Sequence, residues 1–365
     1  MFEQSGGPYL YAKQAFGDFF GYEVGVMKWI VSIIAWATMA VGFSTALSAL
    51  IPQIASPVLQ KTIAIGIILT LSLVNLLGIN IMAYLNNIAT VAKLIPMAIF
   101  ILGGIWYVEG SNYTPFIPAD LTINSVSTAF IIVFFAFTGF ENLGVAAGDM
   151  ENPKRNVPLA LIISMSFVSV VYFFVQFNCV GILGADLGGT TPVADAMGRV
   201  WGSNGLLLVT LGTLISIGGL NIASSFNTPR CAQALAEGRL LPKFMMKNNK
   251  YNVPYISVLI TGGLAILLTL TGSFAELAAI SVISRFSQYI PTCIAVPVLR
   301  KKSFGHAGYK VPFGLLVPAI AVVASLWLLA NADLYKLVTG LGAMVLVAPL
   351  YILMKKYSSV ENSRP

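Results

Sequence analysis

The sequence is a series of long apolar stretches separated by short polar connections. An apolar stretch of ~20 residues can cross the hydrocarbon core of a bilayer as a helix. The composition agrees, because 57% of the residues are hydrophobic and 10% are charged. A soluble domain has about 25% charged residues. The pattern predicts an all-α integral membrane protein with about ten transmembrane helices, at residues 26–50, 60–79, 87–107, 124–148, 158–184, 203–234, 254–271, 276–298, 312–331 and 334–354.

The net charge of +7 comes from basic residues in alternate connections between the apolar stretches. This distribution is the positive-inside signal of a multi-pass membrane protein, so we expect lipid around the chain and no nucleic acid. Both termini are then expected in the cytoplasm, in the plasma (inner) membrane. The basic residues on that side are Lys13, Lys154, Arg155, Arg239, Lys243, Lys247, Lys250, Arg300, Lys301, Lys302, Lys310, Lys355, Lys356 and Arg364.

Enzymatic and metal chemistry have little support in the sequence. The only histidine, His306, lies in a basic loop, and Cys179, Cys231 and Cys293 are far apart within apolar stretches. We see neither a metal-ligand cluster nor a nucleophile with a base, and we expect no metal, no cofactor and no catalytic residue. Without a linker or low-complexity tract, residues 1–365 are expected to form one membrane domain.

Glu141 lies inside an apolar stretch, between Gly139 and Gly144. An ionisable residue within a span costs roughly 2.5–3.5 kcal/mol on insertion scales. Each glycine lowers helix stability by about 1 kcal/mol relative to alanine. We therefore predict a helix broken near Glu141, with free backbone groups that line a transport site. The alternative is a continuous helix in which Glu141 pairs with a neighbouring span.

Two basic residues also lie within predicted spans. Lys93 is about two turns from the cytoplasmic end of its span, where it could exchange a coupling proton, form a structural ion pair or snorkel. Arg285 stays charged, and we expect it to be a structural partner inside the bundle.

Three further residues have two readings each. Asn221 follows a run of small residues and is either a polar link between helices or a donor in a pocket. Trp36 and Met39 lie near the middle of the first span, where they could pack in the core or line a pocket. The residues alone favour the core.

Four motifs in order resemble the amino acid–polyamine–organocation permeases over essentially the whole chain. SGGPYLYAKQAFG resembles the end of that family's second helix, and FFAFTGFEN with ENPKRNVP resembles the sixth helix and its exit. GGLN with PRCAQALAEGRLLP is similar to the eighth helix, and RFSQYIPTCIAVPVLRKK to the tenth. The resemblance implies an inverted repeat of five plus five helices with two more at the end, and alternating access at the repeat interface. Because no glycine-broken first helix is present, we expect an N-terminally truncated chain holding family helices three to twelve.

The resemblance also implies site residues. The unwound segment would comprise Gly139, Phe140 and Glu141, with Phe135 as the outer gate and Thr138 in the pocket. Trp36 and Met39 would match pocket-facing positions on the third helix, and Lys93 would match the lysine that replaces a sodium site in proton-coupled members. We also expect Asn221 to belong to the substrate site.

The predicted function is secondary active transport of amino acids, proton-coupled and directed to small or apolar substrates. Because a pocket carboxylate could pair with a cationic substrate, a cationic amino acid or polyamine exchanger is an alternative. A second alternative is a permease fragment or sensor that does not transport. The sequence leaves symport or antiport and the oligomeric state open.

Overall fold

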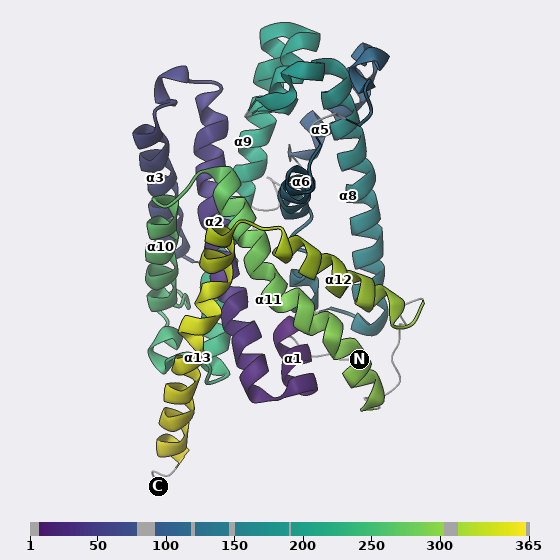
Figure 1. Cartoon of the computed structure of the whole chain (residues 1–365). Helices are drawn as coiled ribbons and strands as arrows, with labels where there is room; N and C mark the ends of the chain where they lie inside the picture. Colours follow the sequence, from purple (N-terminus) through teal and green to yellow (C-terminus); the bar gives the residue numbers. More distant parts are fainter. Residues whose placement is uncertain are drawn as a thin grey trace.

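The computed structural model describes residues 7–78, 92–117, 121–145, 150–189, 191–302 and 313–362. The described part is helical apart from turns, short 3-10 segments and one isolated bridge (Figure 1). Its α-helices are α1 (Pro8–Phe16), α2 (Asp18–Ser48), α3 (Pro57–Asn75), α5 (Leu94–Gly104), α6 (Ile123–Ala136), α7 (Asn142–Val145), α8 (Pro153–Leu183), α9 (Pro192–Glu237), α10 (Tyr255–Thr269), α11 (Phe274–Lys301), α12 (Leu316–Ala330) and α13 (Leu334–Asn362).

Each predicted span corresponds to one of these helices, except residues 124–148, which cover α6 and α7. In the described part, 6 helices are long and apolar enough to cross a membrane, and shorter apolar helices lie in the other predicted spans. The long segments are Asp18–Ser48, Pro57–Asn75, Pro153–Gly188, Pro192–Glu237, Phe274–Lys301 and Leu334–Ile352. The predicted span residues 79, 87–91, 146–148 and 312 lie outside the described residues. The chain is thus a multi-pass, all-α membrane protein.

Local sequence explains several helix starts. The Ser56 side chain accepts a hydrogen bond from Leu59 N, and Pro57 occupies the first turn of α3. Thr122 with Ser125 at the start of α6, and Ser273 with Glu276 at the start of α11, satisfy each other's backbone groups as capping boxes. These polar residues end the connections and fix where the apolar helices begin.

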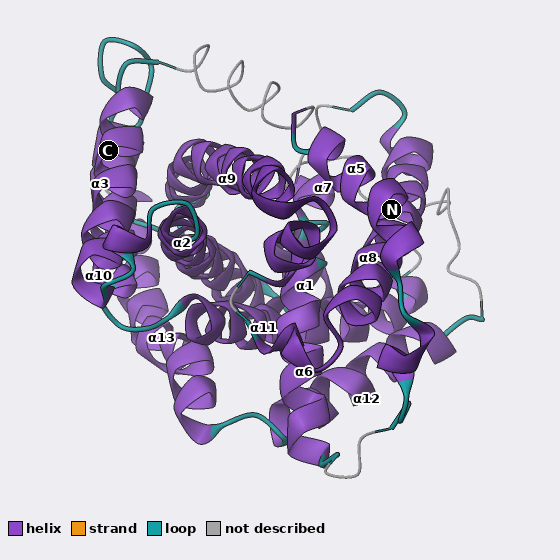
Figure 2. Ribbon diagram, turned by 90° about the horizontal axis from the view of Figure 1, so that it is seen from above, coloured by secondary structure: helices purple, strands orange, loops and turns teal. Residues whose placement is uncertain are grey.

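α2 and α11 lie in the middle of the molecule (Figure 2). α2 packs against α9, α11, α1, α3, α10 and α13, and α11 also packs against α6, α12 and α13. α3 and α10 lie together on one side, whereas α5 and α8 lie on the other, next to α9 (Figures 1 and 2). The central position of α2 explains why so many of its side chains are buried.

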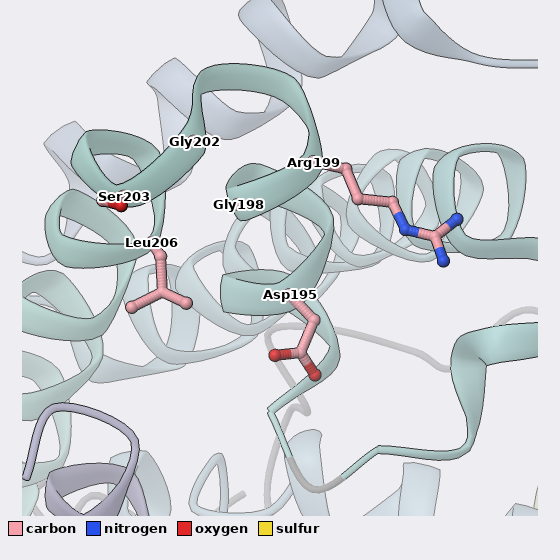
Figure 3. A pocket seen from close by; sticks show the side chains of 6 residues that line it. All are labelled: Asp195, Gly198, Arg199, Gly202, Ser203 and Leu206. Atoms are coloured by element: carbon pink, nitrogen blue, oxygen red, sulfur yellow. The ribbon is translucent and has the colours of Figure 1, made fainter. Parts of the chain in front are cut away.

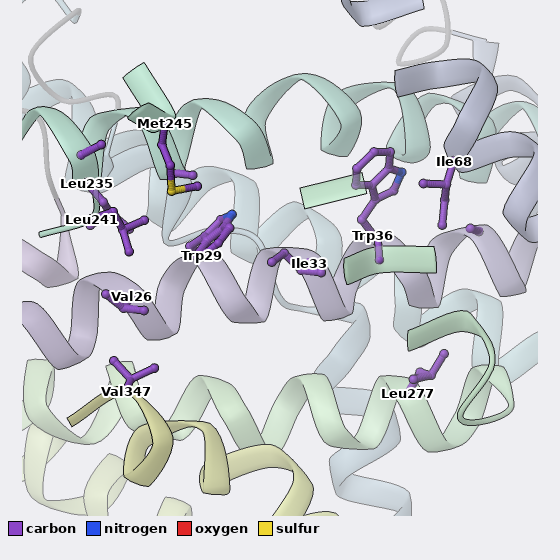
Figure 4. Packing of buried hydrophobic residues seen from close by; sticks show 14 of the residues in the cluster. Val26, Trp29, Ile33, Trp36, Ile68, Leu235, Leu241, Met245, Leu277 and Val347 are labelled. Atoms are coloured by element: carbon purple, nitrogen blue, oxygen red, sulfur yellow. The ribbon is translucent and has the colours of Figure 1, made fainter. Parts of the chain in front are cut away.

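The largest core cluster joins α2 to α3, α9, α10, α11 and α13. Trp36 of α2 is fully buried in it and lies beside Ile68 of α3 (Figure 4). Glycines allow close crossings elsewhere: a Cβ on Gly212 of α9 would lie 2.4 Å from Pro96 of α5. Such small residues are typical where membrane helices pack closely, because lipid gives little hydrophobic drive for association.

The basic connections gather at one end of the bundle. Lys302, directly after α11, donates hydrogen bonds to the carbonyl oxygens of Gln14 (3.0 Å) and Ala15 (3.2 Å) in α1. α1 and the end of α13 lie at this same, lower end in Figure 1.

Candidate functional site

The fourth predicted span, residues 124–148, is interrupted as expected from its glycines. α6 ends at Ala136, residues 137–141 form turns, and α7 begins at Asn142. Gly139 has φ of 109°, a conformation that L side chains rarely adopt. The helix break predicted near Glu141 is confirmed.

Glu141 is buried in this break and its carboxylate is held from three directions. Arg285 Nη1 donates to Oε1, and Tyr289 Oη donates to Oε2 at 3.1 Å, both from α11. The backbone N–H of Gly139 also donates to Oε2, at 3.0 Å. Arg285 is therefore a partner inside the bundle, as predicted. A buried ion pair with further hydrogen bonds holds the broken segment against α11.

A second cation lies beside this pair. Lys28 of α2 is 8% exposed, and its Nζ donates to Asn142 Oδ1 at 2.9 Å. Lys28 also interacts electrostatically with Glu141 and Arg285. The residues that meet here come from α2, from the α6–α7 break and from α11.

The predicted outer residue Phe135 lies near the opposite end of α11. Its ring meets Phe274, the first residue of α11, edge to face with 6.0 Å between centroids. Thr138 is half-buried, and its hydroxyl donates to the Phe135 carbonyl at 2.7 Å. Both residues belong to the end of α6 and the turn after it, on the α6 side of Glu141.

Asn221 and Met39 are brought together between α9 and α2. Asn221 Nδ2 donates to the carbonyl oxygens of Met39 and Ile217, each at 3.0 Å. Asn221 is fully buried, and its Oδ1 has no hydrogen-bond partner in the described structure. This geometry links α2 to α9 and leaves the Asn221 Oδ1 acceptor without a described partner. Trp36, three residues before Met39, is fully buried, with Nε1 likewise unpartnered there.

Lys93 is separate from the charged residues around Glu141. It precedes α5, is half-buried, and α5 packs on α8 and α9 rather than on α2 or α11. Across the described ranges its ammonium group has no hydrogen-bond or ion-pair partner. The predicted proton-coupling residue is thus not among the described partners of Glu141.

A surface pocket of about 450 Å³ lies at a kink in α9, away from the predicted site residues. Trp201 and Gly202 are non-helical there, directly before residue 203, where the predicted span begins. Asp195 and Arg199 line the pocket, but the Arg199 side chain extends away from Asp195 (Figure 3). It pairs instead with Asp186 and donates to the Ile182 carbonyl at 3.2 Å.

Lys28 was missed by the sequence reasoning, because the predicted span began at residue 26 and a lysine near a span end can snorkel. α2 begins earlier, at Asp18, so Lys28 lies about 15 Å along the helix at about 1.5 Å per residue. The available signal was the run VGVMKWIV, a single charge within apolar residues. Tyr289 carried no such signal, since only the fold places it at Glu141.

Comparison with known proteins agrees with this architecture. The amino acid permease family model matches residues 1–353. An uncharacterized transporter of Mycobacterium tuberculosis is 31% identical, covering 90% of this chain and 75% of that protein. The serine/threonine exchanger of Bacillus subtilis is 26% identical (97% of this chain, 82% of that protein), and its branched-chain amino acid permease is 24% identical (98% and 81%). The family model and these relatives describe transporters rather than enzymes, and the chain belongs to the amino acid permease family.

Proposed function

We propose that this chain takes part in proton-coupled uptake of small or apolar amino acids by alternating access. The main support for this proposal is the break between α6 and α7, where Glu141 is paired with Arg285 of α11 inside the bundle. The chain also belongs to the amino acid permease family. Broken helices inside a membrane protein supply backbone groups that bind polar substrates.

In this proposal the substrate lies between the break, α2 and α9. The turn around Gly139 forms the wall on the α6 side, and Thr138 contributes its hydroxyl. Met39 and Asn221 form the opposite wall, next to the buried Trp36. Phe135 closes the outer side against Phe274, and Lys93 takes and releases the coupling proton.

The proposed setting is the plasma (inner) membrane, with both termini in the cytoplasm. The basic residues around the end of α9, the end of α11 and α1 support this orientation, because cytoplasmic connections carry an excess of Lys and Arg. The pocket at the α9 kink then faces outside.

A neutral substrate fits better than a cationic one. The Glu141 carboxylate already accepts hydrogen bonds from Arg285, Tyr289 and Gly139, so it has little capacity left for a substrate amine. Exchange of neutral amino acids is the second candidate, because one relative is a serine/threonine exchanger.

The test is uptake of labelled L-leucine and L-serine into proteoliposomes, with an inward proton gradient, with none, and with unlabelled amino acid inside. Uptake driven by the gradient supports symport. Uptake that needs internal amino acid favours exchange. Binding without flux would overturn the transport proposal and favour a sensor.

A further inference from the structure

Among the residues that the structure describes, the charges around Lys28 do not balance. Lys28 and Arg285 are two buried cations, and among the described residues Glu141 is the carboxylate that interacts with both. Glu141 is occupied by its three donors, so Lys28 is left with the neutral oxygen of Asn142. A buried charge is costly inside a membrane unless it is paired.

Hydrogen-bond donors are also left over at this place. The Lys28 ammonium has three N–H groups, of which one is used by Asn142. Arg285 Nε has no partner in the described structure. The same holds for both the donor Nε2 and the acceptor Oε1 of Gln288, which is 1% exposed and nearly one turn further along α11. Surplus positive charge and surplus donors are complementary to an anion with oxygen acceptors.

The location is on the inner side of the proposed substrate position. Lys28 lies about 12 Å along α2 from Trp36, toward the end where α2 begins, at about 1.5 Å per residue. Asn142, its partner, opens the short α7 directly after the break. An amino acid that leaves the break toward the cytoplasm would pass these groups.

We infer that Lys28, with the free Arg285 Nε, forms an inner binding site for a carboxylate, which the substrate's carboxylate occupies when the site opens to the cytoplasm. Asn142 holds Lys28 until the carboxylate replaces it. This inference rests on the proposed transport function, and it gives Lys28 a role distinct from proton coupling at Lys93.

The test compares the two faces of the membrane for three variants, with L-leucine as the probe. Right-side-out vesicles give the external KM, and inverted vesicles give the internal KM. Lys28→Met removes the charge at similar length and should raise the internal KM about tenfold or more, with the external KM within about twofold of wild type. Lys28→Arg keeps the charge and should retain most of the internal affinity.

The variant Asn142→Asp distinguishes a binding role of Lys28 from a purely structural one. The carboxylate that this substitution introduces would pair with Lys28 and fill the anion site from within the chain, so the internal KM should rise although the fold keeps its polar contact. A purely structural role for Lys28 predicts that this variant behaves like wild type or is more stable. If Lys28→Met does not fold, Asn142→Asp decides between the two.

Each outcome has a distinct meaning. Loss of internal affinity in Asn142→Asp supports the carboxylate site. An unchanged internal KM in Asn142→Asp, or in folded Lys28→Met, overturns it while transport stands. No L-leucine or L-serine flux in wild type would instead be the failure of the proposed function.

Discussion

At the scale of single residues, the pair between Arg285 and Glu141 decides how the broken segment is held. Each residue is buried, and without the other each would lose its ion-pair partner. Removing one partner of a buried pair costs about 3–5 kcal/mol, whereas replacing both by neutral groups costs far less. Function and stability can therefore be separated by comparing single and double substitutions.

Arg285→Met should lower the free energy of unfolding by about 3–5 kcal/mol, because Glu141 stays buried without its cation. The double variant Arg285→Met with Glu141→Gln should regain most of the loss. Thermal unfolding of purified protein in detergent measures both. If the double variant is as unstable as the single one, the pairing does not explain the stability.

Lys93 supports a prediction about coupling rather than stability. Lys93→Ala should abolish the dependence of uptake on the proton gradient and leave membrane insertion intact, because no described residue depends on its ammonium group. Uptake at several external pH values measures this, with Lys250→Ala, in an exposed loop, as the control. Unchanged proton coupling in Lys93→Ala would refute the proposed role.

At the scale of elements, the break between α6 and α7 depends on one backbone conformation. Gly139 has φ of 109°, and no heavy atom lies within 4 Å of a Cβ built there. A side chain at this position would therefore act through backbone strain rather than through a clash.

Gly139→Ala should destabilise the protein by about 1–3 kcal/mol, the cost of a non-glycine residue in such a conformation. It should also lower transport by favouring a straighter helix. Gly263→Ala is the matched control, since Gly263 lies within α10 with open space around it, and there alanine should stabilise by up to about 1 kcal/mol. Melting temperatures and initial uptake rates distinguish the two, and equal behaviour would mean that the Gly139 conformation is unimportant.

At the scale of the whole molecule, α11 connects the outer and inner sides of the proposed route. Phe274 at its start packs against Phe135, and Arg285 in its middle pairs with Glu141. Lys302, after its end, donates a hydrogen bond to a carbonyl group of α1. A movement of α11 relative to α2 would therefore act on both sides at once.

Phe135→Ala should open the outer side, which predicts a higher external KM and faster leak of trapped amino acid, with normal insertion. Phe130→Ala is the control on the same helix, because Phe130 is exposed and packs edge-on against Trp327. External KM and efflux from loaded vesicles measure the effect. Equal changes in both variants would assign Phe135 to ordinary packing.

The amino-acid sequence by itself determined the helical, membrane-spanning character of the chain, since long apolar stretches are local features that any fold in lipid must bury as helices. The sequence also indicated the break near Glu141, because Gly139 weakens the helix through its own backbone conformation, whatever packs around it. The proposed roles of Trp36, Met39, Asn221, Phe135, Thr138 and Lys93 stay predictions.

Only the tertiary structure decided which charges meet. Glu141 and Arg285 are 144 residues apart, and Lys28 and Asn142 are 114 apart, so no local pattern pairs them. Because α2 begins at Asp18, Lys28 lies well inside the helix and is buried, whereas the sequence placed it near the end of a span. Burial and pairing of a charge depend on which helices pack around it, and that packing is a property of the whole bundle.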